Sequence, residues 1–287
     1  MKLFLFAFKF DLPYNKGGGF HMIKGLVLYD YDGTLVDERD GIYEVTAKTR
    51  KAISLLQDSG YLCVLATGRA LSYIPQEAKN LHLDGYVTCN GAYATIHGKE
   101  IHKVIFDEME LGKLVAYAKK EDINFILEGN SFCYVQDMED KEYLHFIENF
   151  KIPLDNFVQY KDINQVKDKI SKITLICKNK DHLEEAAKQL ENKYQICRHR
   201  NCNSFDLGYK QIHKGVGAKA IIDFYHIDYE NTYAFGDGDN DVELLRDVKY
   251  GIAMRKHDPK LDAVASMVTG TVKEEGIYKA LKKLEVI

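Results

Sequence analysis

The feature that most constrains this chain is a short apolar run, residues 26–29, that leads directly into Asp30 and Asp32. Such a run, bounded by a turn signal at Gly33, predicts a buried strand with both carboxylates at its C-terminal end. Ligands of open parallel sheets bind at this edge. Two carboxylates this close repel each other unless a cation lies between them, and Mg²⁺ prefers hard oxygen ligands. The segment therefore predicts a metal site.

Both acidic clusters of the chain also have to be compared with an EF-hand calcium loop. Such a loop needs a glycine at its sixth position and a glutamate at its twelfth. The loop that begins at Asp30 has Leu35 and Gly41 there, and the loop that begins at Asp237 has two valines. The sequence therefore argues against an EF-hand at either place.

The bulk composition sets the class of protein. The 287 residues are enough for one large core or two domains, and 46% hydrophobic with 29% charged residues is typical of a soluble globular protein. The 39 Lys and Arg against 43 Asp and Glu give a net charge of -4. No run of basic residues is long enough to bind along a nucleic-acid backbone. We therefore expect no nucleic-acid partner.

The first residues favour neither a membrane anchor nor a secretory signal. The apolar run at residues 3–8 is too short to cross a bilayer and has no small-residue cleavage site after it. Residues 1–21 are interpreted as an N-terminal appendage, with Met22 as an alternative start and an extra edge strand as the other possibility. We expect a cytoplasmic protein without a membrane partner.

The six cysteines fit this location. Most of them lie in apolar, strand-like segments, where a reduced thiol behaves as a small hydrophobe. Cys197 and Cys202 flank His199 and could form half of a zinc site, but no second Cys/His pair has the spacing of a structural site. Thiols within strands are the preferred interpretation.

The order of expected elements predicts two domains. Strands and helices alternate near both ends, which is typical of a doubly wound parallel α/β core. The core elements are expected at 43–59 (helix), 61–66 (strand), 70–81 (helix), 85–88 (strand), 216–225 (helix), 232–235 (strand), 242–247 (helix), 251–254 and 267–269 (strands) and 274–284 (helix). Asn90-Gly91, after the strand at 85–88, is a turn signal.

Between these two parts the pattern changes to paired strands separated by helices at 111–120, 139–150 and 182–193. This pattern predicts an inserted α+β domain. We therefore assign residues 22–88 and 208–287 to the core and residues 89–207 to the insert.

Four strand ends of the core carry polar residues. They are Asp30 with Asp32, Thr67 with Gly68, the loop at Lys214, and residues 236–241. Since the carboxyl ends of parallel strands share one edge, we expect these groups to converge in one crevice. Carboxylates, a hydroxyl, backbone N–H groups, an ammonium and an amide suit a bound phosphate with its Mg²⁺.

These segments resemble the four motifs of the haloacid dehalogenase-like (HAD) phosphatases. The matching motifs are Asp30-x-Asp32-Gly33-Thr34, Thr67-Gly68-Arg69, Lys214-Gly215 and Gly236-Asp237-x-x-Asn240-Asp241. The insert lies between the second and third motifs, and Lys214 precedes Asp237 by 23 residues, as in the Cof-type subfamily with a C2 cap. The resemblance covers residues 22–287, and four ordered motifs are far more specific than one.

The resemblance implies a mechanism. Asp30 would be the nucleophile that forms an aspartyl-phosphate, and Asp32 would be the general acid and then the general base. Mg²⁺ would be held by the Asp30 carboxylate, the Asp32 backbone carbonyl and Asp237, with Asp241 acting through water or orienting the others.

The same resemblance implies the phosphate ligands and the substrate. Thr67, the Gly68 amide, Lys214 and Asn240 would hold the phosphoryl oxygens. The substrate would be a small phosphorylated metabolite, such as a sugar phosphate, enclosed by the cap. The specificity residues would lie in the insert, where the motifs are weakest.

One departure from the family concerns charge. The chain has Ala253-Met254-Arg255-Lys256-His257 where these phosphatases often have Ala-Met-Gly-Asn. Arg255 and Lys256 could favour a substrate with a second anionic group, and the alternative is a solvated basic turn.

Two other functions stay open. Gly215-x-Gly217-x-x-Ala220 matches the dinucleotide fingerprint of an NAD-binding oxidoreductase, but the segment before it is not a clean buried strand. A phosphoacceptor or ligand-binding module would accumulate the aspartyl-phosphate without hydrolysing it, and Asp32, placed to activate water, argues against that.

Overall fold

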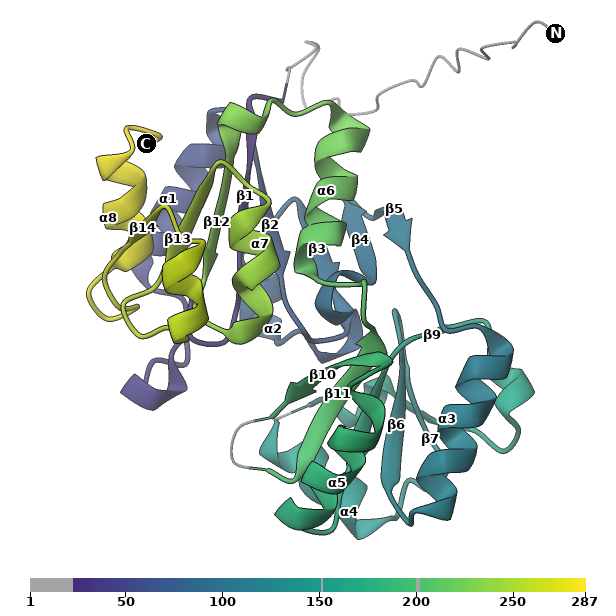
Figure 1. Ribbon diagram of the computed structural model, residues 1–287. Coiled ribbons are helices and arrows are strands. Elements are labelled where there is room, and N and C mark those ends of the chain that lie inside the picture. The colour runs from purple at the N-terminus through teal and green to yellow at the C-terminus, as the bar shows by residue number, and fades with distance from the viewer. Residues whose placement is uncertain (1–22, 151, 200–201) are drawn as a thin grey trace, which may run out of the picture.

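The computed structural model describes residues 23–150, 152–199 and 202–287, and the expected N-terminal appendage lies outside them. The described chain forms two sheets, each with its own helices (Figure 1). Within these ranges, no helix has both the length and the apolar character needed to span a bilayer.

The first sheet has eight strands in the order β14-β13-β12-β1-β2-β3-β4-β5. The strands from β14 to β3 run parallel, and β4 and β5 extend the sheet as antiparallel strands. This arrangement confirms the predicted parallel α/β core. The bounds are β1 Gly25–Tyr29, β2 Tyr61–Ala66, β3 Gly85–Thr88, β4 Tyr93–Ile96, β5 Lys99–Lys103, β12 Thr232–Gly236, β13 Tyr250–Ala253 and β14 Met267–Val268.

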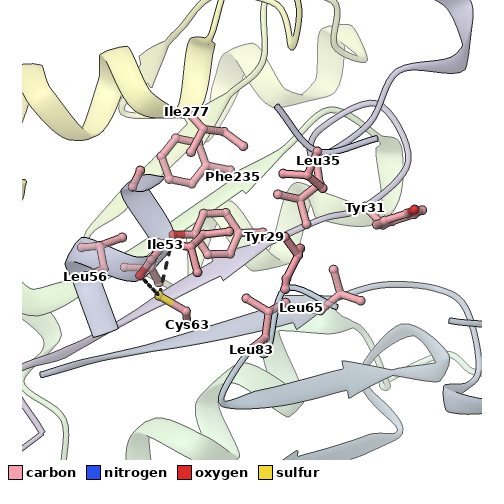
Figure 2. Close-up of a cluster of buried hydrophobic side chains, with 14 of the residues drawn as sticks. Tyr29, Tyr31, Leu35, Ile53, Leu56, Cys63, Leu65, Leu83, Phe235 and Ile277 are labelled. Carbon is pink, nitrogen blue, oxygen red and sulfur yellow. Dashed lines mark hydrogen bonds between the residues drawn. The ribbon is translucent and has the colours of Figure 1, made fainter. Parts of the chain in front are cut away.

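Helices cover both faces of this sheet, and side chains of β1 alternate between them. Val27 and Tyr29 belong to the core under α1, α2 and α8, whereas Leu26 and Leu28 belong to the core under α6 and α7. Tyr29 stacks on Phe235, with ring centroids 5.7 Å apart (Figure 2). The bounds are α1 Ala47–Asp58, α2 Gln76–Lys79, α6 Lys214–Tyr225, α7 Val242–Arg246 and α8 Gly276–Lys283.

One helix of the core is shorter than its sequence pattern predicted. Residues 70–81 were expected to form one helix, but the structure has a 3₁₀ turn at Leu71–Tyr73 and then the single turn α2. Pro75 lies between them, with no N–H to donate and a ring that opposes a continuous helix. The remaining predicted helices are present, with ends that differ by a few residues.

The second sheet has six strands in the order β10-β11-β9-β6-β7-β8, antiparallel except for the pair β7 and β8. Helices α3 and α5 pack on one face of it, and α4 packs beside the other. The bounds are α3 Glu108–Lys120, β6 Asn124–Gly129, β7 Cys133–Val135, α4 Lys141–Asn149, β8 Phe157–Gln159, β9 Ile170–Ile176, α5 Lys180–Leu190, β10 Tyr194–Arg198 and β11 Ser204–Tyr209.

The insert begins later than the predicted residue 89. Strands β4 and β5 pair with the core sheet, so the assignment of residues up to Lys103 to the insert was wrong. Asn90 and Gly91 both have positive φ, of 52° and 96°, and turn the chain from β3 back into β4. The sequence analysis recognised the turn but did not predict β4 beyond it.

A hydrophobic cluster joins the two units. It combines Ala70 and Tyr73, which follow β2, with Ile126 and Val135 from the second sheet and with residues of α4. Tyr73 also stacks on Phe157, with ring centroids 5.8 Å apart. The second sheet therefore packs against the C-terminal edge of the parallel sheet.

Candidate active site

The two central strands of the core bring the first and last motifs together. Asp30 follows β1 and Asp237 follows β12, and these strands pair in parallel register. The backbone N–H of Asp30 donates to the carbonyl of Phe235 at 2.9 Å. Both carboxylates therefore leave the sheet at the same edge, as the strand-end argument predicted.

A buried cluster of charges lies at this edge. Lys214 Nζ is 2.6 Å from Asp30 Oδ1 and 2.7 Å from Asp241 Oδ1, and its side chain is fully buried. Carboxylate oxygens of Asp30, Asp237 and Asp241 lie within 4.8 Å of one another. The structure thus brings together three predicted metal ligands and the predicted lysine.

The ionisation of this cluster is strongly coupled. Burial, and next the Asp241 carboxylate, raise the pKa of Asp30 well above its usual value, while Lys214 lowers it. Burial acts to lower the pKa of Lys214, but the carboxylates of Asp241 and Asp30 outweigh burial and raise it above its ordinary value. The ammonium is therefore charged and holds two carboxylates beside it.

Other groups fix the directions of the two later aspartates. Asp241 Oδ2 accepts the backbone N–H groups of Asp237 and Gly238 at 3.0 and 2.9 Å. Asp237 accepts a hydrogen bond from Thr34 Oγ1 at 3.2 Å and from Arg39 Nη2 at 3.3 Å. Both carboxylates are thus oriented before any ligand binds.

The turn after β1 leaves room for Asp237. Gly33 has a φ of 99°, and a Cβ at this position would lie 2.2 Å from Asp237 Oδ2. Any larger residue would push this carboxylate away from Asp30. The glycine of the first motif is therefore required by the close approach of the fourth.

The donor set fits a divalent cation. Asp30, Asp237 and Asp241 are the group of metal-ligating side chains that converges in the described part of the chain, and all three are buried. Three carboxylates in a desolvated place, with one ammonium among them, repel each other unless more positive charge is present. Oxygen ligands of this kind suit Mg²⁺.

Asp32 lies apart from this cluster. Its side chain is 51% exposed, and both of its oxygens are bound by Arg69, with Nη2 to Oδ1 at 2.8 Å and Nε to Oδ2 at 2.9 Å. The guanidinium of Arg69 also lies over the ring of Tyr31. The structure therefore places the predicted acid and base beside the site, in a bidentate ion pair.

The predicted phosphate ligands of the second and fourth motifs meet at Asn90. A Cβ on Gly68 would lie 2.8 Å from Asn90 Oδ1, and the same oxygen accepts Asn240 Nδ2 at 3.0 Å. Thr67 is buried, and its Oγ1 accepts the backbone N–H of Arg69 at 3.2 Å. Gly68 and Asn240 are thus neighbours across the crevice.

The sequence analysis missed three residues of this site. Asn90 follows β3, so the same strand-end argument could have found it, but it was interpreted only as a turn. Thr34 was quoted within the first motif without a role, and it contacts Asp237. Arg39, in a 3₁₀ turn after the first motif, had no signal in the sequence.

The basic residues that depart from the family pattern pair with acids of the core. Arg255 Nε is 3.1 Å from Glu274 Oε2, and Lys256 pairs with Asp40. That Arg255 and Lys256 favour a substrate with a second anionic group stays a prediction.

The dinucleotide fingerprint does not have its required context. Gly215 and Gly217 lie in α6, and the strand before that helix, β11, belongs to the second sheet. A dinucleotide site needs the strand and the helix in one βαβ unit.

Comparison with known proteins identifies the family. A model of the haloacid dehalogenase-like hydrolases matches residues 27–281. The chain belongs to this family. One relative, "Putative phosphatase YkrA" of Bacillus subtilis, is 27% identical over 264 residues, which cover 91% of this chain and 98% of that protein.

Solved structures share the fold of this chain over both units. A protein from Geobacillus kaustophilus has a TM-score of 0.80 and 27% identity, and the match covers 92% of this chain and 100% of that one. The subclass IIB sugar phosphatase BT4131 has a TM-score of 0.76 and 26% identity, with the same coverage. The core with its insert is therefore a fold that phosphatases of this family use.

Proposed function

We propose that this hydrolase is a Mg²⁺-dependent phosphatase that cleaves a small phosphomonoester through an aspartyl-phosphate. The observation that carries the proposal is the buried cluster of Asp30, Asp237 and Asp241 around Lys214, at the edge where four motifs converge. A nucleophilic carboxylate, a cation site and phosphate-binding groups in one place suit phosphoryl transfer.

In the first half of the reaction, a carboxylate oxygen of Asp30 attacks phosphorus, and the bond from phosphorus to the leaving oxygen breaks. Asp32, as general acid, gives its proton to that oxygen, which is worth about 10²–10⁴-fold in rate. Thr67, Gly68, Lys214 and Asn240 hold the other phosphoryl oxygens while charge moves onto them.

In the second half, Asp32 takes a proton from water, and the water oxygen attacks phosphorus. The bond between phosphorus and Asp30 breaks, so that phosphate leaves and both carboxylates return to their starting forms. Since Arg69 binds both oxygens of Asp32, this ion pair has to open before Asp32 can exchange a proton.

Asp30 and Asp237, with Asp241 nearby, would hold Mg²⁺, and the backbone carbonyl of Asp32 is a further candidate ligand. When bound, the metal would offset the repulsion between these carboxylates and polarise the phosphoryl oxygens, which stabilises transition-state charge by on the order of several kcal/mol. The residues around it keep their directions through Thr34, Arg39 and backbone N–H groups.

The insert is proposed to act as a cap that encloses a small phosphorylated metabolite. It packs over the edge that carries the cluster, and residues of both units, among them Asn90, Lys172 and Asp206, line a gap of about the size of one water between them. A sugar phosphate is a suitable class, in line with the sugar phosphatase BT4131, which has the same architecture.

The test compares Asp30→Asn with wild-type protein in phosphate release from p-nitrophenyl phosphate in Mg²⁺. Asp239→Asn is the matched control, because Asp239 is 61% exposed and pairs with the surface residue Lys260. We expect the Asp30 variant to lose at least about 10³-fold in kcat, the control to keep wild-type activity, and chelation by EDTA to abolish turnover.

Many turnovers per wild-type molecule would distinguish hydrolysis from a phosphoacceptor, which stops after one. Substantial Mg²⁺-dependent turnover by Asp30→Asn would refute the assignment of the nucleophile.

A further inference from the structure

The insert contains a second buried charge cluster, which the proposed mechanism does not use. Lys172 lies on the central strand β9, opposite Glu128 of β6, and Asp206 of β11 lies opposite Thr174 of the same strand. Lys172, Glu128 and Asp206 are all buried. Thr174 Oγ1 lies within hydrogen-bond distance of a carboxyl oxygen of both Glu128 and Asp206, so the cluster is connected across three strands.

Lys172 reaches out of its own sheet. Its Nζ is 2.6 Å from Asp206 Oδ2, 3.1 Å from Glu128 Oε2 and 3.0 Å from the backbone oxygen of Gly68. The ammonium donates hydrogen bonds to Asp206 and to the Gly68 carbonyl, and Glu128 is its ion-pair partner without a hydrogen bond. Asp206 and Glu128 belong to the insert, whereas the Gly68 carbonyl belongs to the second motif of the core.

The carbonyl of Gly68 and the N–H of Arg69 are parts of one planar peptide group. Lys172 fixes the oxygen, and the N–H on the other side donates to Thr67 Oγ1 at 3.2 Å. The same segment carries the Arg69 guanidinium that binds Asp32. The direction of one peptide group therefore affects a phosphate ligand and the partner of the acid and base.

The charges around Lys172 are arranged to keep it in this place. His199 Nε2 is 3.0 Å from Asp206 Oδ1, so Asp206 lies between two cationic partners. Burial would favour loss of the proton from Lys172, but Asp206 and then Glu128 outweigh it and raise its pKa above the usual value. A charged ammonium with fixed partners has little freedom to turn away from Gly68.

We propose that Lys172 is a positioning residue through which the insert holds the Thr67–Arg69 segment in its phosphate-binding conformation. The inference rests on the proposed phosphatase function and adds to it. The phosphate site is complete when the insert packs on the core, because only then does the Lys172 ammonium meet the Gly68 carbonyl.

The test is the pair of substitutions Lys172→Met and Glu128→Gln in one protein. Together they remove one positive and one negative charge, so Asp206 keeps its partner His199 and no buried charge is left without a counter-charge. The matched control is Lys178→Met, because Lys178 is 53% exposed and pairs with Asp122 on the surface of the insert.

The first measurement is binding of inorganic phosphate by calorimetry in Mg²⁺, which needs no turnover. We expect the double variant to bind phosphate about 10–100-fold more weakly, as happens when an outer partner of a site is removed, and the control to bind as wild type does. The second measurement is kcat/KM for p-nitrophenyl phosphate and for glucose 6-phosphate, which we expect to fall by the same factor.

Wild-type phosphate affinity in the folded double variant would overturn the proposal. So would a loss confined to glucose 6-phosphate, because that would make Lys172 a contact for the leaving group. If wild-type protein binds phosphate but releases none from either ester, the proposed function fails, and the binding measurement still decides this inference.

If the double variant does not fold, Lys172→Arg replaces it. Arginine keeps a positive charge beside both carboxylates, but its planar guanidinium is larger than the ammonium and does not fit between the oxygens of Asp206, Glu128 and Gly68. The same weakening of phosphate binding is expected, and unchanged binding would again overturn the proposal.

Discussion

The substitution Lys214→Met tests the electrostatics of the buried cluster directly. The change keeps the length and most of the volume of the side chain, but it removes the ammonium that lies 2.6 Å from Asp30 and 2.7 Å from Asp241. Removing one partner of a buried ion pair costs about 3–5 kcal/mol, because the other charge is left buried without compensation. At roughly 2–4 °C per kcal/mol in a chain of this size, Tm falls by about 6–20 °C.

Two further results are expected of the Lys214 variant. Adding Asp241→Asn removes one of the buried carboxylate charges that have lost their ammonium partner, so the double variant should have a higher Tm than Lys214→Met. Mg²⁺ should raise Tm more in Lys214→Met than in wild type, because the cation replaces the lost positive charge, and a ligand at 100 times its Kd stabilises by about 2.7 kcal/mol.

The assay is thermal unfolding followed by circular dichroism, with and without Mg²⁺. Lys219→Met is the control, because Lys219 is 70% exposed and pairs with Asp223 one turn along α6, so its loss should cost less than about 1 kcal/mol. Lys214 is not the charge partner of these carboxylates if the Tm of Lys214→Met lies within about 2 °C of the wild-type Tm. The same conclusion follows if neither Asp241→Asn nor Mg²⁺ reduces the difference in Tm between the variant and wild type.

Two other predictions follow from the same contacts. Burial acts to lower the pKa of His199, but Asp206 outweighs burial and raises this pKa to about 9. The contribution of the His199–Asp206 pair to the free energy of unfolding is therefore fully present below about pH 6.5 and is lost as the pH rises through about 9. Between pH 6 and pH 10, the free energy of unfolding should fall by up to about 3 kcal/mol in wild type, and this fall should be absent in His199→Gln. An equal fall in the variant would contradict the prediction. Asn90→Gly keeps a residue that accepts positive φ but removes the hydrogen-bond acceptor for Asn240. We expect kcat/KM to fall about 10-fold with little change in Tm. An unchanged kcat/KM would show that Asn90 has no role in the site.

The active site was more predictable than the insert because it depends on a topological rule. Parallel strands end at one edge, so Asp30 and Asp237 could be placed together without knowing which helix packs where. Lys214 did not follow from this rule, because the strand before it, β11, belongs to the second sheet, and only its motif indicated a place in the site. The side-chain position of Asp32 did not follow, because its ion pair with Arg69 depends on the conformation of the long arginine side chain, which the strand-end rule does not fix.

The charge cluster of the insert could not have been predicted from sequence. Glu128, Lys172 and Asp206 are 34 or more residues apart from one another, and they meet only because β6, β9 and β11 pair in one antiparallel register. A shift of one residue in either pairing would turn one member to the other face of the sheet. The boundary of the insert was missed for a similar reason, since the hairpin of β3 and β4 depends on three consecutive residues with positive φ, Cys89, Asn90 and Gly91.

The two buried clusters differ in charge balance, and this difference supports a divalent cation at one of them. In the insert, two carboxylates face Lys172 and a protonated His199, so the cluster is neutral by itself. At the active-site edge, three buried aspartates face one fully buried ammonium, and Arg39 reaches Asp237 while it also pairs with Asp37. With all three aspartates ionised, the excess would be two negative charges, and since uncompensated buried charge is costly, a bound Mg²⁺ would neutralise it.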